Sequence, residues 1–140
     1  MPELLRSFTS ILRTFVGNRR WAPRYHARLS FEVSIVEAKG GGVNGHRSLP
    51  TLAGHTFDLS SSGIGLIVPA IRIGEQYLTG EGRVLRLKLE LGGDFIQLHV
   101  RPVRYEKLEG DEHGYIIGAH ILEIGAEERA LYLRYLKGLA

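Results

Sequence analysis

Hydrophobic and polar residues alternate with a period of two along most of this chain, and that alternation predicts β-strands with one buried face. The clearest example is residues 85–91, where four leucines alternate with Arg86, Lys88 and Glu90. Gly92 and Gly93 follow and predict a hairpin turn. Near Pro102 the alternation changes phase, which indicates a β-bulge. The predicted strands are residues 27–35, 55–59, 64–68, 85–91, 96–105 and 115–121.

The period changes to that of a helix near the C-terminal end. Glu127 and Glu128 lie in the first turn of this helix and Lys137 in its last, which suits the helix dipole. Its apolar stripe consists of Leu131, Tyr132, Tyr135 and Leu136. Six antiparallel strands joined mostly by short turns, followed by one helix, predict an all-β fold: a small closed barrel with a C-terminal helix.

The N-terminal segment has its own pattern. Apolar residues within 3–16 recur at helical spacing, Pro2 suits a helix start, and Gly17 with Asn18 suits its end. We therefore divide the chain into an N-terminal amphipathic helix with its connector (1–18) and a barrel domain (19–140). The apolar stripe needs cover from the barrel, from a second copy in a homodimer, or from a membrane surface. The lack of lysine and tryptophan in this segment disfavours the membrane, so we expect packing within the protein.

Composition narrows the class of protein. The chain has 140 residues, enough for one domain, and a formal net charge of +3. It contains no cysteine, which excludes disulfides and thiolate chemistry. Six arginines but a single acid occur in residues 1–28, and such a basic patch indicates an anionic partner. No apolar run reaches the roughly 18 residues of a membrane span or resembles a secretion signal, so a cytoplasmic protein is expected.

Enzyme signatures are missing from the sequence. The six histidines show no metal-ligand spacing, and no G-x-S-x-G nucleophile motif occurs. The glycine-rich stretch 40–45 is not followed by Lys-Ser/Thr, so it predicts a loop rather than a phosphate cradle. Ser60 and His55 could act as a nucleophile and its base, but serine and histidine in a strand-and-turn region are usually structural, and structural roles are favoured. We expect no enzyme, no catalytic residue, no metal site and no cofactor.

Two short motifs carry the candidate chemistry. Arg20 and Arg24 lie four residues apart before the first strand, and a guanidinium binds phosphate bidentately or stacks on a base. Asp58, Ser60 and Gly63 lie between two strands. A carboxylate there suits the N–H donors of guanine, a hydroxyl adds a hydrogen bond, and glycine permits a tight turn. Taken alone, the second motif is also typical of a serine-rich turn.

The order of these motifs, about 35 residues apart with a strand between them, resembles the PilZ family of cyclic di-GMP (c-di-GMP) receptors. Arg20-x-x-x-Arg24 and Asp58-x-Ser60-x-x-Gly63 match the family's RxxxR and [D/N]xSxxG signature. The segment GYIIGAHILEI, followed by a helix, resembles the family's C-terminal end. The resemblance implies c-di-GMP as the ligand of these five residues and of the adjacent Arg19, where an arginine favours two stacked ligands over one.

The leading hypothesis is a non-enzymatic, cytoplasmic bacterial receptor. Its arginine arm becomes ordered on the barrel when c-di-GMP binds, and the new surface acts on an unidentified downstream protein. Arg24 and Arg28 are also four residues apart, but Arg28 lies within the predicted strand, so the Arg20–Arg24 register is preferred. One alternative is a small nucleic-acid-binding barrel. Such barrels expose aromatic residues for base stacking, whereas the predicted strands of this chain have charged outer faces, so no nucleic acid is expected. Another is an interaction module that has lost its ligand.

Overall fold

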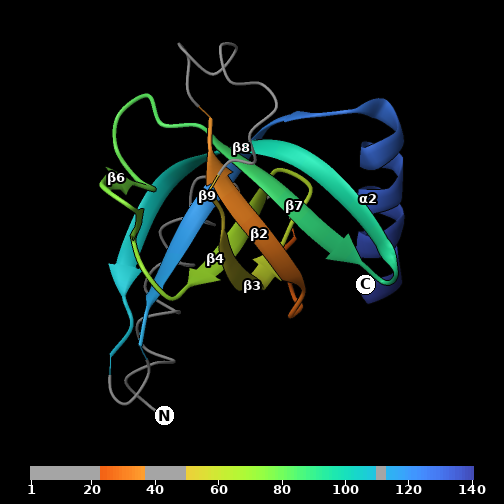
Figure 1. Cartoon of the computed structure of the whole chain (residues 1–140). Coiled ribbons are helices and arrows are strands. Elements are labelled where there is room, and N and C mark those ends of the chain that lie inside the picture. Colours follow the sequence, from red (N-terminus) through yellow and green to blue (C-terminus); the bar gives the residue numbers. More distant parts are fainter. Residues whose placement is uncertain (1–22, 37–49, 110–112) are drawn as a thin grey trace.

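The structure, a computed structural model, describes residues 23–36, 50–109 and 113–140. Within these ranges the chain forms nine strands and one helix (Figure 1). The elements are β1 (Tyr25–His26), β2 (Ser30–Ile35), β3 (Leu52–Leu59), β4 (Gly63–Val68), β5 (Arg72–Ile73), β6 (Gln76–Tyr77), β7 (Leu85–Leu91), β8 (Asp94–Lys107), β9 (Tyr115–Ile124) and α2 (Ala126–Leu139). The expected N-terminal helix at residues 3–16 lies outside the described residues.

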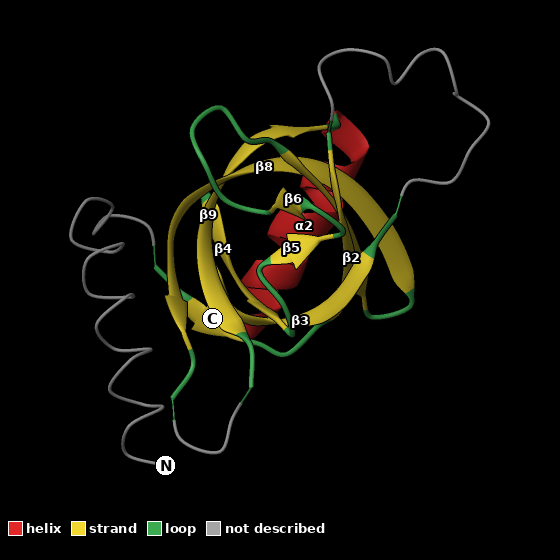
Figure 2. Ribbon diagram, turned by 60° about the vertical axis from the view of Figure 1, so that its left-hand side comes forward, coloured by secondary structure: helices red, strands yellow, loops and turns green. Residues whose placement is uncertain are grey.

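Six of the strands close into an antiparallel barrel, as the sequence predicted. They pair in the order β3-β2-β7-β8-β9-β4, and β4 also pairs with β3, which completes the ring. Figure 2 shows this ring viewed along its interior. Helix α2 covers one end of the barrel, and the β5–β6 hairpin lies toward the other end (Figures 1 and 2). Closure removes open sheet edges over most of the ring and encloses a single main core.

The core follows the predicted alternation. The four leucines of β7 are at most 5% exposed, whereas Lys88 and Glu90 between them face solvent. Strand β8 continues the pattern with Ile96, Leu98 and Val100 buried. Tyr132 and Leu136 of α2 are buried against this core, so the predicted C-terminal helix is confirmed. No helix among the residues described is long and apolar enough to cross a membrane.

The bulge near Pro102 is confirmed, but its consequence differs from the expectation. The register between β8 and β9 shifts between Pro102 and Arg104, and a second shift lies between His99 and Val100. We expected Val103 and Tyr105 to continue the buried face. They are 45% and 53% exposed instead, because this half of β8 extends beyond its pairing with β7.

The first predicted strand, residues 27–35, starts later than expected, because β2 begins at Ser30. Residues 25–26 form the separate β1, and the regular pairing of β2 with β3 begins only at Ser30. The Thr56 hydroxyl bridges the gap: it accepts from the Leu29 N–H at 2.9 Å and donates to the Ala27 carbonyl at 2.5 Å. The β5–β6 hairpin was not predicted, because strands of two residues are too short to show alternation.

Candidate ligand-binding site

The β3–β4 hairpin turn contains the second motif, and Ser60 organises it. The Ser60 N–H donates to the Gly63 carbonyl at 2.9 Å. The Ser60 hydroxyl oxygen accepts from the N–H of Gly63 at 3.0 Å and of Ser62 at 3.3 Å. Ser60 is fully buried, so its hydroxyl shapes the turn from inside. The resemblance predicts a hydrogen bond from this hydroxyl to a ligand base or its neighbours; in the structure the hydroxyl is bonded within the turn.

Arg24 and Asp58, one residue from each motif, form a bidentate ion pair. Arg24 Nε lies 2.6 Å from Asp58 Oδ2, and Arg24 Nη2 lies 3.0 Å from Oδ1. Arg24 Nη1 approaches the Ser60 hydroxyl at 3.5 Å, near the limit of a hydrogen bond. The two side chains are 9% and 1% exposed, so the pair is largely removed from water. Charge-assisted, two-pronged contacts of this kind fix the guanidinium in one orientation.

Pairing of β1 with β3 brings the two motifs together. Tyr25 lies opposite Leu59, and His26 lies opposite Asp58. Arg24 immediately precedes β1 and therefore lies beside the end of β3, where the turn begins. The contact between Arg24 and Asp58 spans 34 residues of sequence. The two-residue strand β1 therefore sets the position of Arg24 relative to the β3–β4 turn.

Gly65 leaves room for the carboxylate. It lies opposite Asp58 across the β3–β4 pair, and a Cβ built at this position would overlap Asp58 Oδ1. Any larger residue would therefore push the carboxylate out of its present place. Sequence reasoning missed Gly65, although its position two residues after Gly63 on the same strand was visible in the motif's neighbourhood.

Tyr132 of α2 is the second residue that sequence reasoning missed as part of the site. Its hydroxyl donates to the Ser60 carbonyl at 2.6 Å and lies 3.5 Å from the Gly63 carbonyl. Tyr132 was predicted only as a member of the apolar stripe of the helix. A hydroxyl on a buried stripe generally requires a hydrogen-bond partner, and that was the available signal.

The other arginines near the first motif do not contact the turn in the described part of the chain. Arg19 and Arg20 lie outside the described residues. Arg28 is exposed, and its Nη1 lies 2.9 Å from Nε2 of His55 rather than at the turn. Between Arg24 and Arg28, it is therefore Arg24 that reaches Asp58 and Ser60. His55 and Ser60 belong to these separate interactions, which suits the structural roles favoured for them over nucleophilic chemistry.

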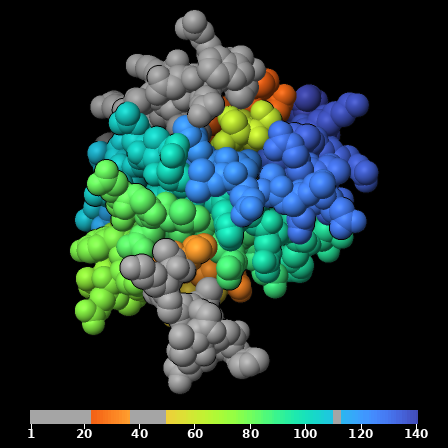
Figure 3. Space-filling model, turned by 90° about the horizontal axis from the view of Figure 1, so that it is seen from above, coloured from red at the N-terminus to blue at the C-terminus, as the bar shows by residue number. Residues whose placement is uncertain are grey.

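The surface around the turn combines three parts of the chain. Figure 3 shows the first described residues (orange) beside a yellow-green patch from the region around residue 60, with the blue surface of β9 and α2 adjoining it. Within the described part of the chain, no group of three or more histidine or acidic side chains could hold a metal ion. The site is therefore a junction between the strand β1, the β3–β4 turn and the helix α2.

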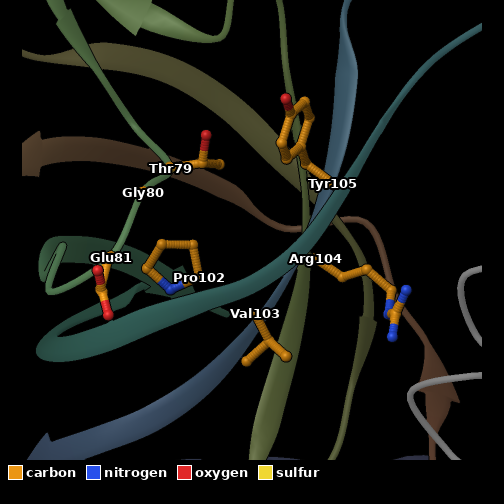
Figure 4. A pocket seen from close by; sticks show the side chains of 7 residues that line it. All are labelled: Thr79, Gly80, Glu81, Pro102, Val103, Arg104 and Tyr105. Carbon is orange, nitrogen blue, oxygen red and sulfur yellow. The ribbon is translucent and has the colours of Figure 1, made fainter.

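A second concave region lies elsewhere on the barrel. It is a groove of about 440 Å³ between the 79–81 loop and residues 102–105 of β8. In Figure 4, the Arg104 side chain points away from this loop, and no residue of either motif lines the groove. Two exposed aromatic residues on β8, Phe95 and Tyr105, are ten residues apart, near opposite ends of this strand. They do not share one base-stacking surface.

The family model of the PilZ domain matches residues 18–138 of this chain. The chain belongs to the PilZ family. A search among curated proteins found no match for this PilZ domain. Several solved structures share its fold at low sequence identity.

The PilZ domain of YcgR from Escherichia coli, solved with c-di-GMP, superimposes with a TM-score of 0.60 at 15% identity, covering 86% of this chain and 91% of that one. The Bacillus subtilis inhibitor of motility MotI/DgrA gives 0.56 at 16% identity over 86% of this chain and 50% of its own. PlzA from Borreliella burgdorferi, in complex with c-di-GMP, gives 0.55 at 14% identity over 94% and 56%. This PilZ domain thus spans about half the length of the last two proteins.

Proposed function

We propose that this PilZ domain is a non-enzymatic receptor for c-di-GMP, with Arg19, Arg20, Arg24, Asp58, Ser60 and Gly63 as its ligand-binding residues. The observation that carries the proposal is the convergence of Arg24 with Asp58 and Ser60 at the β3–β4 turn. The family assignment supports it, as does the likeness to PilZ structures solved with this ligand.

The chemistry of the site suits a dinucleotide that carries both phosphates and guanines. Arginine binds phosphate through paired N–H donors and stacks on flat bases. Arg24 is held at the rim of the turn by Asp58, so its guanidinium is pre-oriented and little rotamer freedom remains to be lost on binding. Arg19 and Arg20 precede it closely in the sequence and would add positive charge for the two phosphates of the ligand.

Isothermal titration of the full chain with c-di-GMP tests this proposal. We expect saturable binding with two nucleotides per chain, because the arginine at position 19 adds a cation that a stacked second ligand can use. Arg19→Leu should reduce the stoichiometry to one while binding persists. No measurable binding at high micromolar ligand would refute the receptor function. A one-to-one stoichiometry that Arg19→Leu leaves unchanged would refute only the role of Arg19.

We also propose how ligand binding is passed on to a downstream protein. The arginine arm that precedes Arg24 becomes ordered on the barrel when c-di-GMP binds, and the changed surface alters the interaction with a downstream protein in the cytoplasm. Residues 3–16 form an amphipathic helix joined directly to this arm. The helix packs on its own barrel or pairs with a second copy, so ligand binding at the arginines moves or releases it.

Hydrogen exchange tests this coupling. With saturating c-di-GMP, we expect amide exchange in residues 3–16 to change, because the connector to Arg24 pulls on the helix. The β7–β8 hairpin, whose leucines are buried in the barrel, serves as an internal reference that should stay unchanged. Identical exchange in residues 3–16 with and without ligand would remove the helix from the switch. Size-exclusion chromatography in the same two states would report a homodimer.

A further inference from the structure

Helix α2 touches the ligand-binding turn through one polar contact. Tyr132 lies in the middle of the helix and is 1% exposed. Its hydroxyl donates to the Ser60 carbonyl at 2.6 Å and lies 3.5 Å from that of Gly63. Both acceptors are backbone atoms of motif residues, and the helix otherwise meets the core through apolar side chains such as Leu136.

We propose that Tyr132 is a positioning residue for the c-di-GMP site: its hydroxyl holds the Ser60–Gly63 turn against α2 in the shape that binds ligand. It follows that the helix responds to occupancy of the turn. This inference rests on the proposed receptor function. It assigns α2 a role beyond covering the end of the barrel, because the link between helix and site is a specific hydrogen bond.

The hydroxyl is not needed to fill the core. Phenylalanine would occupy nearly the same volume, and a buried phenol is retained at a cost unless its O–H finds an acceptor. Burial raises the pKa of the Tyr132 phenol far above its usual value, so the group is a neutral donor at neutral pH. Nearby Arg24 lowers and Asp58 raises that pKa, which places the hydroxyl within electrostatic reach of the ion pair.

Other contacts hold other parts of the turn. The turn is closed by its own bonds between Ser60 and Gly63, and its tip is held by the Ile121 N–H of β9, which donates to the Ser62 carbonyl at 2.9 Å. Tyr132 holds the two ends of the turn, the Ser60 and Gly63 carbonyls, on the side facing α2. Without the hydroxyl, the turn should therefore still form, but its first and last residues, Ser60 and Gly63, would no longer be fixed relative to the helix and to Arg24.

The test is Tyr132→Phe in the full chain, with Tyr135→Phe as the matched control. Tyr135 lies on the same helix, is half-buried and packs against the same core. At a temperature where each variant is fully folded, we expect Tyr132→Phe to weaken c-di-GMP binding about tenfold, as loss of one buried hydrogen bond predicts. Tyr135→Phe should bind as the wild type does.

Three outcomes decide between the hypotheses. If the wild type does not bind c-di-GMP, the receptor function fails. If the wild type binds and Tyr132→Phe binds equally well, even with a lower melting temperature, the hydroxyl stabilises the fold only and the positioning role is refuted. Should Tyr132→Phe not fold, wild-type hydrogen exchange decides instead: ligand should slow exchange in α2, and an unchanged helix would refute the coupling.

Discussion

Arg24→Ala is expected to weaken c-di-GMP binding by about 2–5 kcal/mol, because it removes a guanidinium from the proposed site and leaves charge on the ligand unpaired. The same change should lower the free energy of unfolding by about 3 kcal/mol, because it leaves the buried Asp58 carboxylate without its partner. Titration calorimetry measures the first effect, and urea denaturation followed by circular dichroism measures the second. We expect both losses to be clear at neutral pH.

A double variant separates the two losses. In Arg24→Ala/Asp58→Ala the stranded charge is gone, so stability should recover relative to Arg24→Ala while ligand binding remains weak. Arg28→Ala is the matched control: this arginine is exposed, contacts His55 and lies away from the turn, so its replacement should be mild for both quantities. If binding returned in the double variant, Arg24 would act only by neutralising Asp58. If Arg28→Ala proved the more damaging change, the motif would be Arg24 with Arg28.

Gly65→Ala is expected to damage the site without touching either motif. The new Cβ would overlap Asp58 Oδ1, so the carboxylate must move and its two bonds to Arg24 must lengthen or break. Overpacking of this kind costs about 1–3 kcal/mol of stability, and c-di-GMP affinity should fall by roughly tenfold or more as Arg24 loses its orientation. Thermal melting and the same titration measure these effects.

The control for this prediction is Gly138→Ala. Gly138 lies in the last turn of α2, and a Cβ there would meet nothing within 4 Å. Since alanine favours a helix over glycine, stability should be unchanged or slightly higher, with unaltered ligand affinity. A Gly65→Ala variant that binds c-di-GMP as tightly as the wild type would show that the position of the Asp58 carboxylate is unimportant for the ligand.

The barrel could be predicted from the sequence because β7 and the first half of β8 alternate between buried and more exposed residues. That is a local property, and it was visible in the leucines of β7 as strict alternation. The prediction was wrong where a distant group replaced the local pattern. The strand expected at 27–35 begins only at Ser30, because the Thr56 hydroxyl binds the Leu29 N–H and the Ala27 carbonyl. Val103 and Tyr105 are exposed because β8 outruns its neighbour β7.

The site shows the same division between local and distant causes. Motif spacing identified Arg24, Asp58 and Ser60 as candidates for one site, and β1 does bring them together. Their mutual contacts were not visible in the spacing, which did not indicate that Asp58 binds Arg24. Tyr132 was read as a core residue, because nothing in the helical periodicity indicates where a hydroxyl will point.

The bond between Tyr132 and Ser60 has a consequence for biosynthesis. It joins residues 72 positions apart, and the ring of strands cannot close before β9 has been made. During translation both motifs are made before α2, which contains the tyrosine that binds the turn. Chains rich in such long-range contacts also fold slowly, in about milliseconds to seconds. If the chain is a c-di-GMP receptor as proposed, a complete site would form only after β9 and α2 have been made, and shorter chains would not bind the ligand.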